Sequence, residues 1–158
     1  MELRVEGVLK DKGIEYRLIK MRAAAFTVDD VAKYSDGKIN PEETCKTIIL
    51  SGKKTGKKAA VFLRGASKVN FSGAKKLFGE EMAIATAETV KEVSGVDPGA
   101  VCPFMLTAPL YVDKKVLALE TINCGSGDHL HGLEFKTKDL GKGVKYEVVE
   151  VAKEVDNV

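Results

Sequence analysis

The chain has 158 residues, 44% of them hydrophobic, and its 25 basic and 23 acidic residues leave a formal net charge of +2. This length and composition predict one compact domain over residues 1–158 that buries a sizeable core. Three cysteines without a CxxC pair argue against a disulfide framework and against a structural zinc site. The sequence has no apolar run of about 18 residues and no signal-peptide pattern, so we expect a cytoplasmic protein without a membrane partner.

The N-terminal part of the chain predicts two helices with a strand between them. Apolar residues at helical spacing predict a helix over residues 2–12 that stops at Gly13. Alternation of polar and apolar residues predicts a strand over residues 15–20. Thr27 and Asp30 then resemble a capping box, which predicts that a short second helix begins there.

The basic residues are concentrated in residues 46–76, a segment that contains no carboxylate. Strand patterns over residues 46–50 and 59–63, with a lysine-rich turn between them, predict a hairpin that carries this charge. Clustered cations attract polyanions, although a lysine-rich surface that serves only solubility is an equally weighted alternative. The nine basic residues are Lys46, Lys53, Lys54, Lys57, Lys58, Arg64, Lys68, Lys75 and Lys76.

The second half of the chain has more strand patterns than helix patterns, and no internal repeat. Together with the first half it predicts an α/β (α+β) domain built on a mixed sheet. The predicted elements are a helix over residues 72–78 ended by Gly79, a strand over residues 82–85, a helix from Thr86 to Gly95, and strands over residues 110–112, 116–121, 132–136 and 146–151.

Two features of the chain are suited to binding an anion or an acyl group. Lys46 stands at the head of an apolar strand, so packed neighbours hold its backbone and make the ammonium a fixed point charge for a phosphate. A strand-end lysine that simply reaches water is the commoner alternative. Residues 99–103 lie in a loop with two glycines and two prolines, whose stiff backbone offers N–H groups to a carbonyl or an oxyanion. A plain connecting loop explains the same composition.

A second glycine-rich turn, residues 124–132, carries both histidines of the chain. On a strand, His129 and His131 share a face, and with Cys124 or Asp128 they form a weaker candidate for a metal site. The sequence lacks a GxSxG elbow, and no base is identifiable for Cys102, so neither a serine nor a cysteine hydrolase is supported.

Several of these segments, taken in order, resemble the YbaK/proline-tRNA-synthetase-associated (YbaK/ProX) family of aminoacyl-tRNA editing domains. The similarity extends over most of residues 2–150. The matching segments are residues 45–50 with Lys46, the Gly-Ala-Val-Cys-Pro loop at 99–103 continuing into Phe104, Pro-Leu-Tyr-Val-Asp at 109–113, and the glycine turn at 125–127.

The resemblance implies a mixed, barrel-like β-sheet core flanked by helices, and hydrolysis of the ester that joins a wrong amino acid to a tRNA. It implies no metal and no cofactor. The partner that the resemblance implies is the aminoacylated 3′ end of a tRNA. An aminoacyl-tRNA synthetase is a further candidate partner, and DNA is not expected to be one. We expect trans-editing of a small amino acid, of the proline-tRNA class first.

The resemblance also implies roles for particular residues. Lys46 engages the terminal nucleotide, while the loop of Gly99, Ala100, Val101, Cys102 and Pro103 holds the aminoacyl carbonyl and orients water, with the Cys102 thiol incidental. The predicted substrate-binding residues are Phe104, Gly125, Ser126 and His131, with His129 as an alternative to His131, and Val101, Phe104 and Met105 are expected to limit the pocket to small amino acids. Lys53, Lys54, Lys57, Lys58, Arg64, Lys75 and Lys76 are expected to bind tRNA phosphates.

Two competing hypotheses are kept. The first is that the chain is a non-catalytic RNA- or nucleotide-binding module with the same fold. The second is that it is a thiol or metal enzyme that uses Cys102 or the group of Cys124, His129 and His131.

Overall fold

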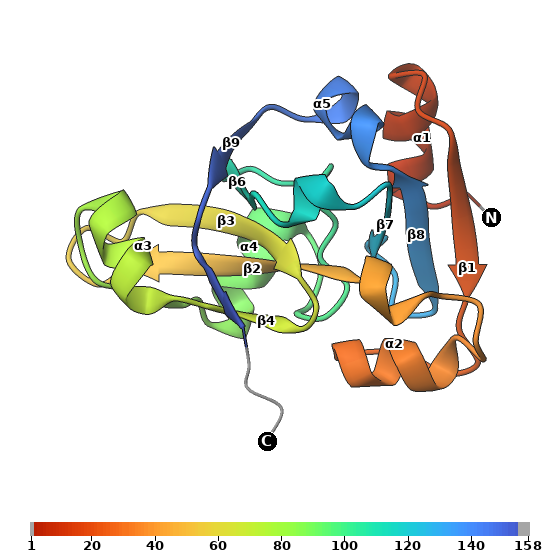
Figure 1. The fold of residues 1–158 in the computed structure, drawn as a ribbon, viewed down its shortest axis with the longest axis horizontal. Helices are drawn as coiled ribbons and strands as arrows, with labels where there is room; N and C mark the ends of the chain where they lie inside the picture. Colours follow the sequence, from red (N-terminus) through yellow and green to blue (C-terminus); the bar gives the residue numbers. More distant parts are fainter. Residues whose placement is uncertain (1, 155–158) are drawn as a thin grey trace.

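The computed structural model describes residues 2–154, and within them strands outnumber helices (Figure 1). None of the helices in this range is both long and apolar enough to cross a bilayer. The helices are α1 (Arg4–Asp11), α2 (Val28–Tyr34), α3 (Phe71–Phe78), α4 (Ala87–Ser94) and α5 (Leu140–Gly143), with short 3₁₀ turns η1 (Pro41–Glu43), η2 (Val116–Ala118) and η3 (Thr137–Asp139). The strands are β1 (Tyr16–Lys20), β2 (Cys45–Gly52), β3 (Lys58–Arg64), β4 (Ser67–Val69), β5 (Met82–Ile84), β6 (Leu110–Asp113), β7 (Thr121–Gly125), β8 (His131–Lys136), β9 (Tyr146–Val149) and β10 (Ala152–Glu154).

The strands form one large sheet and two small ones. The large sheet has the order β5-β2-β3-β6-β9, and it is mixed because β3 pairs antiparallel with β2 and parallel with β6. The small sheets have the orders β1-β8-β7 and β10-β4. The expected mixed α+β architecture is therefore confirmed, although the sheets formed by residues 2–154 are open and do not close into a barrel.

The core lies on both faces of the large sheet, because alternate residues of a strand point to opposite faces. In β3, Ala60 and Phe62 belong to a cluster that also takes residues from α1 and α4. Val61 and Leu63 belong to a second cluster, on the face that α3 covers through Ala74. Every side chain from residue 59 to residue 63 is completely buried, which is typical of a central strand covered on both faces.

The predicted ends of the helices are confirmed where capping residues marked them. The Thr27 hydroxyl accepts from the Asp30 N–H at 3.0 Å at the start of α2, and the Thr86 hydroxyl accepts from the Thr89 N–H at the start of α4. Gly79 and Gly95 end α3 and α4 in the left-handed conformation, which glycine adopts without steric cost.

The strand predicted over residues 116–121 is wrong. Asp113 accepts a hydrogen bond from the Lys115 N–H at 3.1 Å, and this tight turn leads into η2. The strand comes later, as β7, and includes Cys124 and Gly125, which the sequence suggested were part of a turn. Pairing with β8 over its whole length holds β7 in a sheet despite its weak strand propensity.

Asp113 joins the large sheet to the C-terminal strand. Its side chain is only 2% exposed, and one carboxylate oxygen accepts hydrogen bonds from the backbone N–H groups of Val151 and Ala152, at 2.9 and 3.0 Å. A buried carboxylate needs such donors to offset the loss of hydration. The aspartate of the Pro-Leu-Tyr-Val-Asp segment therefore has a structural role.

Candidate functional site

A cavity of about 690 Å³ opens where the start of β2 meets the small sheet that contains β7 and β8. This is within the size range of small-molecule sites. Its lining is formed by Met21, residues 25–29, Val31, Ala32, Ile39, Pro41, Glu42, residues 44–48, residues 64–66, residues 98–101, residues 123–125, Asp128, His129, His131 and Gly132. The strand-head lysine and the glycine-proline loop therefore line the same cavity.

Lys46 is half-buried at this cavity, and its ammonium donates to the Gly65 carbonyl at 3.1 Å. No carboxylate within residues 2–154 lies in ion-pair range of this ammonium. Burial, followed by the positive charge of Lys68, lowers the pKa of Lys46. A desolvated cation without a counter-ion favours an incoming anion, since the anion supplies the missing opposite charge.

The loop at residues 98–101 packs tightly against its neighbours. Gly99 has φ +101°, and a Cβ placed on it would lie 2.4 Å from the Phe26 carbonyl oxygen. A Cβ on Gly125 would lie 2.4 Å from the Val101 carbonyl oxygen. Only glycine fits at either position, and both contacts fix the loop in place.

The same loop presents backbone donors that have no partner. The carbonyl of Pro98 lies 3.2 Å from His129 Nε2, and the carbonyl of Ala100 accepts from the Gly127 N–H at 2.8 Å. In contrast, the N–H groups of residues 99–102 donate to no acceptor anywhere in residues 2–154. Buried backbone donors are nearly always paired in folded proteins, and Ala100 and Val101 are 1% and 6% exposed. Such donors are available to an oxyanion or a carbonyl.

His131 and Asp128 form a second polar group on the cavity wall. His131 Nδ1 lies 2.9 Å from Asp128 Oδ2. Burial raises the pKa of Asp128, but the hydrogen bond from the Leu130 N–H and the contact with His131 outweigh it, and the net shift is downward. When the ring carries its proton on Nδ1, it donates to this carboxylate, and Nε2 is then the free acceptor.

Comparison with known proteins agrees with this geometry. The model of the aminoacyl-tRNA editing domain family matches residues 22–142, which is most of the chain. The chain belongs to this family.

Solved structures have the same fold. The hypothetical protein APE2540 is 28% identical, with a TM-score of 0.84 over 94% of this chain and 99% of its own. A protein described as a proposed trans-editing enzyme for prolyl-tRNA synthetase is 22% identical, with a TM-score of 0.81 over 95% of each chain. At this identity the second comparison shows a shared fold.

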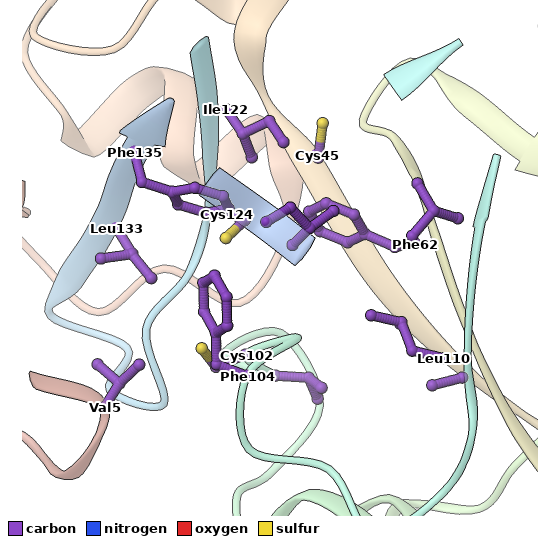
Figure 2. Packing of buried hydrophobic residues seen from close by; sticks show 14 of the residues in the cluster. Val5, Cys45, Phe62, Cys102, Phe104, Leu110, Ile122, Cys124, Leu133 and Phe135 are labelled. Carbon is purple, nitrogen blue, oxygen red and sulfur yellow. The ribbon is translucent and has the colours of Figure 1, made fainter. Parts of the chain in front are cut away.

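Several residues predicted for the site of this editing domain lie behind the cavity wall. Phe104 packs edge-on against Phe135 with ring centroids 5.0 Å apart, and it belongs to the core together with Cys102 (Figure 2). Met105 is partly buried and packs against this core. Phe104 and Met105 therefore do not line the cavity, whereas Val101 does. Pro103 does not line it either.

Ser126 is also buried behind the wall, where its hydroxyl donates to the His131 carbonyl at 2.6 Å and holds the glycine turn closed. The two histidines do not share a strand face, because His129 lies in the turn and only His131 belongs to β8.

The three thiols are unsuited to nucleophilic catalysis. Burial raises the pKa of Cys45 and of Cys102 to about 12, and it raises the pKa of Cys124 well above its ordinary value. A catalytic cysteine needs a stabilised thiolate, so the geometry gives the thiol-enzyme hypothesis no support. Within residues 2–154, His, Cys, Asp and Glu side chains do not gather in threes as a metal site requires.

The basic segment divides into two groups at opposite ends of the β2–β3 hairpin. Lys53 follows Lys46 by seven residues, which in a strand is roughly 23 Å. Figure 1 shows α3 beside the far end of this hairpin. The tip lysines are defined here as Lys53, Lys54, Lys57 and Lys58 of the turn between β2 and β3 and its edge, with Lys75 and Lys76 of α3. Glu81 lies 3.9 Å from Lys53 and 4.0 Å from Lys75, and such exposed pairs contribute little to stability.

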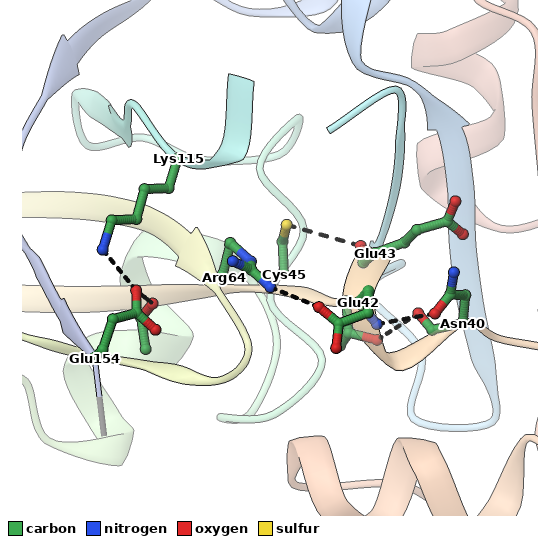
Figure 3. Close-up of polar contacts among 9 residues, drawn as sticks. Asn40, Glu42, Glu43, Cys45, Arg64, Lys115 and Glu154 are labelled. Carbon is green, nitrogen blue, oxygen red and sulfur yellow. Dashed lines mark hydrogen bonds and ion pairs between the residues drawn. The ribbon is translucent and has the colours of Figure 1, made fainter. Parts of the chain in front are cut away.

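Arg64 lies at the cavity end of the hairpin, where it forms an ion pair with Glu42 at 3.0 Å (Figure 3). Its charge is thus partly neutralised, unlike that of Lys46. Glu42 comes from η1, outside the basic segment, and no local pattern indicated that the two side chains would meet.

Among the lining residues that sequence reasoning missed, three bear directly on ligand binding. Thr47 and Asn123 each carry a buried side-chain oxygen without a partner in residues 2–154. The Asn123 amide nitrogen donates to Glu43 at 3.2 Å, so its free oxygen is an acceptor for a ligand. The third residue is Phe26, and the only available signal was its position directly before the capping threonine.

Proposed function

We propose that this chain is an aminoacyl-tRNA deacylase that hydrolyses, in trans, the ester of a small, wrongly attached amino acid, of the proline-tRNA class first. One observation carries the proposal: an ammonium without a carboxylate partner and the three unpaired backbone N–H groups of Gly99, Ala100 and Val101 occur at the same cavity. A tRNA 3′ end offers a phosphate to the first and an ester carbonyl to the second. An action in trans is supported by the likeness, over 95% of each chain, to the protein described as a proposed trans-editing enzyme.

The reaction proceeds by attack of water on the ester carbonyl carbon. The N–H groups of Gly99, Ala100 and Val101 stabilise the negative charge that develops on the carbonyl oxygen. His131 Nε2 accepts the proton of the attacking water, and Asp128 keeps the ring in the required tautomer. The C–O bond to the ribose then breaks, the ribose oxygen takes up a proton, and the free amino acid leaves.

No nucleophilic side chain and no metal enter this sequence of steps. An ester bound in the correct orientation is already reactive toward water, so positioning and a few donors supply much of the rate. Size supplies selectivity, because the space beside Val101, Thr47 and Cys124 is lined by small and medium side chains.

Purified aminoacyl-tRNAs that carry wrong amino acids provide the test. The wild-type chain should release at least one small amino acid, and Lys46→Ala should reduce kcat/KM strongly. Lys12→Ala is the matched control, since Lys12 is exposed at the end of α1, away from the cavity. Release by Lys46→Ala at the wild-type rate contradicts the proposal.

The non-catalytic alternative makes a different prediction in the same assay. A binding module retains the tRNA on a filter without releasing any amino acid. Association with an aminoacyl-tRNA synthetase stays a prediction, to be checked by co-purification with the tRNA removed by nuclease.

A further inference from the structure

Phe26 is a large aromatic side chain that is 55% exposed at the mouth of the cavity. A single exposed aromatic is not unusual, but the backbone of this one is held from several sides. The Phe26 N–H donates to Asp30 at 3.0 Å, and the preceding Ala25 N–H donates to the His129 carbonyl at 2.9 Å. Gly99 packs against the Phe26 carbonyl. The structure therefore holds in place the backbone of a residue whose ring gains little from burial.

The His129 ring lies against the ring of Phe26. The two centroids are 4.4 Å apart with planes tilted by 34°. His129 Nε2 lies 3.2 Å from the Pro98 carbonyl, which fixes the imidazole against the glycine-proline loop. One side of the aromatic pair is thereby supported, while more than half of the Phe26 side chain stays open to solvent.

The position of this pair relates it to the two anion-binding features. Phe26 contacts Gly99, the first residue of the loop with free N–H groups. Two residues further on, Val28 lies against Gly65, since a Cβ on Gly65 would be 3.1 Å from Val28 Cγ1. The Gly65 carbonyl accepts from the Lys46 ammonium. Phe26 thus lies between the acyl-binding donors and the phosphate-binding cation. It contacts the donor loop itself, and Val28, which contacts Gly65, is at most about 7 Å further along the chain.

We propose that Phe26, supported by His129, is a stacking surface for the base of the terminal tRNA nucleotide. This inference rests on the proposed function, because it takes the nucleotide phosphate at Lys46 and the ester at the loop. In an aminoacylated nucleotide the base lies beside the ribose that joins phosphate and ester. Aromatic side chains hold unpaired bases by stacking on their π faces.

A purely structural role for Phe26 is the competing explanation. An apolar residue directly before a helix cap commonly packs on the fourth residue of the helix, here Val31, as a hydrophobic staple. Leucine can serve as a staple but offers no flat π face, so Phe26→Leu separates the two explanations. Phe26→Trp keeps a π face, and Phe71→Ala is a matched control, because Phe71 is 41% exposed on α3 at the other end of the molecule.

The experiment is a fluorescence titration with uncharged tRNA that carries 2-aminopurine as its 3′-terminal base, a probe whose emission falls when it stacks. The wild-type chain, Phe26→Trp and Phe71→Ala should quench the probe. Phe26→Leu and Phe26→Ala should lose the quenching and bind roughly 5- to 150-fold more weakly. Thermal melting of each variant shows whether it is folded. Absence of quenching by the wild-type chain, or wild-type quenching and affinity in Phe26→Leu, overturns the inference.

Because uncharged tRNA cannot be deacylated, this experiment is separate from the test of the proposed function. Quenching that depends on Phe26, in a protein that releases no amino acid, leaves the stacking surface intact and refutes the deacylase. Release of an amino acid with wild-type quenching in Phe26→Leu does the reverse.

Discussion

Replacing Gly99 by alanine tests whether the geometry of the glycine-proline loop sets the activity. At φ +101° an L-residue is strained, at a cost of about 1–3 kcal/mol. The new Cβ would lie 2.4 Å from the Phe26 oxygen, closer than the 3.0 Å below which Cβ contacts essentially do not occur, so the two segments must separate by at least 0.6 Å (3.0 minus 2.4). We expect a loss of unfolding free energy of about 2–4 kcal/mol.

The same displacement should affect catalysis. A shift approaching 1 Å in a catalytic group can reduce the rate about 100-fold, so we expect Gly99→Ala to lower kcat/KM for the mischarged tRNA by roughly 10- to 100-fold. The two measurements are urea unfolding and single-turnover release of the amino acid, at a temperature where the variant is folded.

Gly13→Ala is the control for backbone strain alone. Gly13 has φ +67°, and a Cβ on it would meet no atom within 4 Å. Its alanine variant should lose about 1–2 kcal/mol of stability and keep its wild-type kcat/KM. If Gly99→Ala also keeps the wild-type kcat/KM, the loop does not position the ester and the reasoning is refuted.

Four further predictions concern charge and buried polar groups. Burial and then the charge of Lys68 lower the pKa of Lys46, so its ammonium loses its proton at a lower pH than an exposed lysine does. tRNA binding should weaken as this proton is lost. In a titration of binding against pH, Lys68→Ala should move the loss of binding to higher pH. The lowered pKa also means that the folded chain keeps the charged ammonium at a cost in stability, which is fully present below that pKa and is relieved as the pH rises toward the unfolded value, so Lys46→Met should not lower stability in urea unfolding at neutral pH. Asp113→Ala leaves the backbone N–H groups of Val151 and Ala152 unpaired and should cost about 3–5 kcal/mol by urea unfolding, against less than about 0.5 kcal/mol for the exposed Asp11→Ala. If the tip lysines contact phosphates, alanine at each contacting position should reduce the slope of log affinity against log salt by about 0.9, and unchanged slopes would assign them to solubility.

The elements with strong local signals could be predicted from the sequence. Capping residues such as Thr86 and left-handed glycines such as Gly95 act within one turn of chain, so their effect is visible without the fold. The apolar runs of β2 and β3 likewise predicted a buried hairpin. The strand prediction for residues 116–121 failed because the Asp113 carboxylate accepts a hydrogen bond that turns the chain, and hydrophobic periodicity does not reveal such a bond.

For the site, the sequence by itself determined which residues have suitable chemistry: a lysine at the head of a core strand, a stiff loop rich in backbone donors, and histidines in a glycine turn. Only the tertiary structure decided which of them meet. It placed Lys46, residues 99–101 and His131 around one cavity, turned Cys102 and Phe104 into the core, and separated the tip lysines from the rest. It also brought Phe26 and Glu42 to the wall. The physical reason is that side-chain direction and close approach depend on packing between segments far apart in the chain, which sequence spacing does not encode.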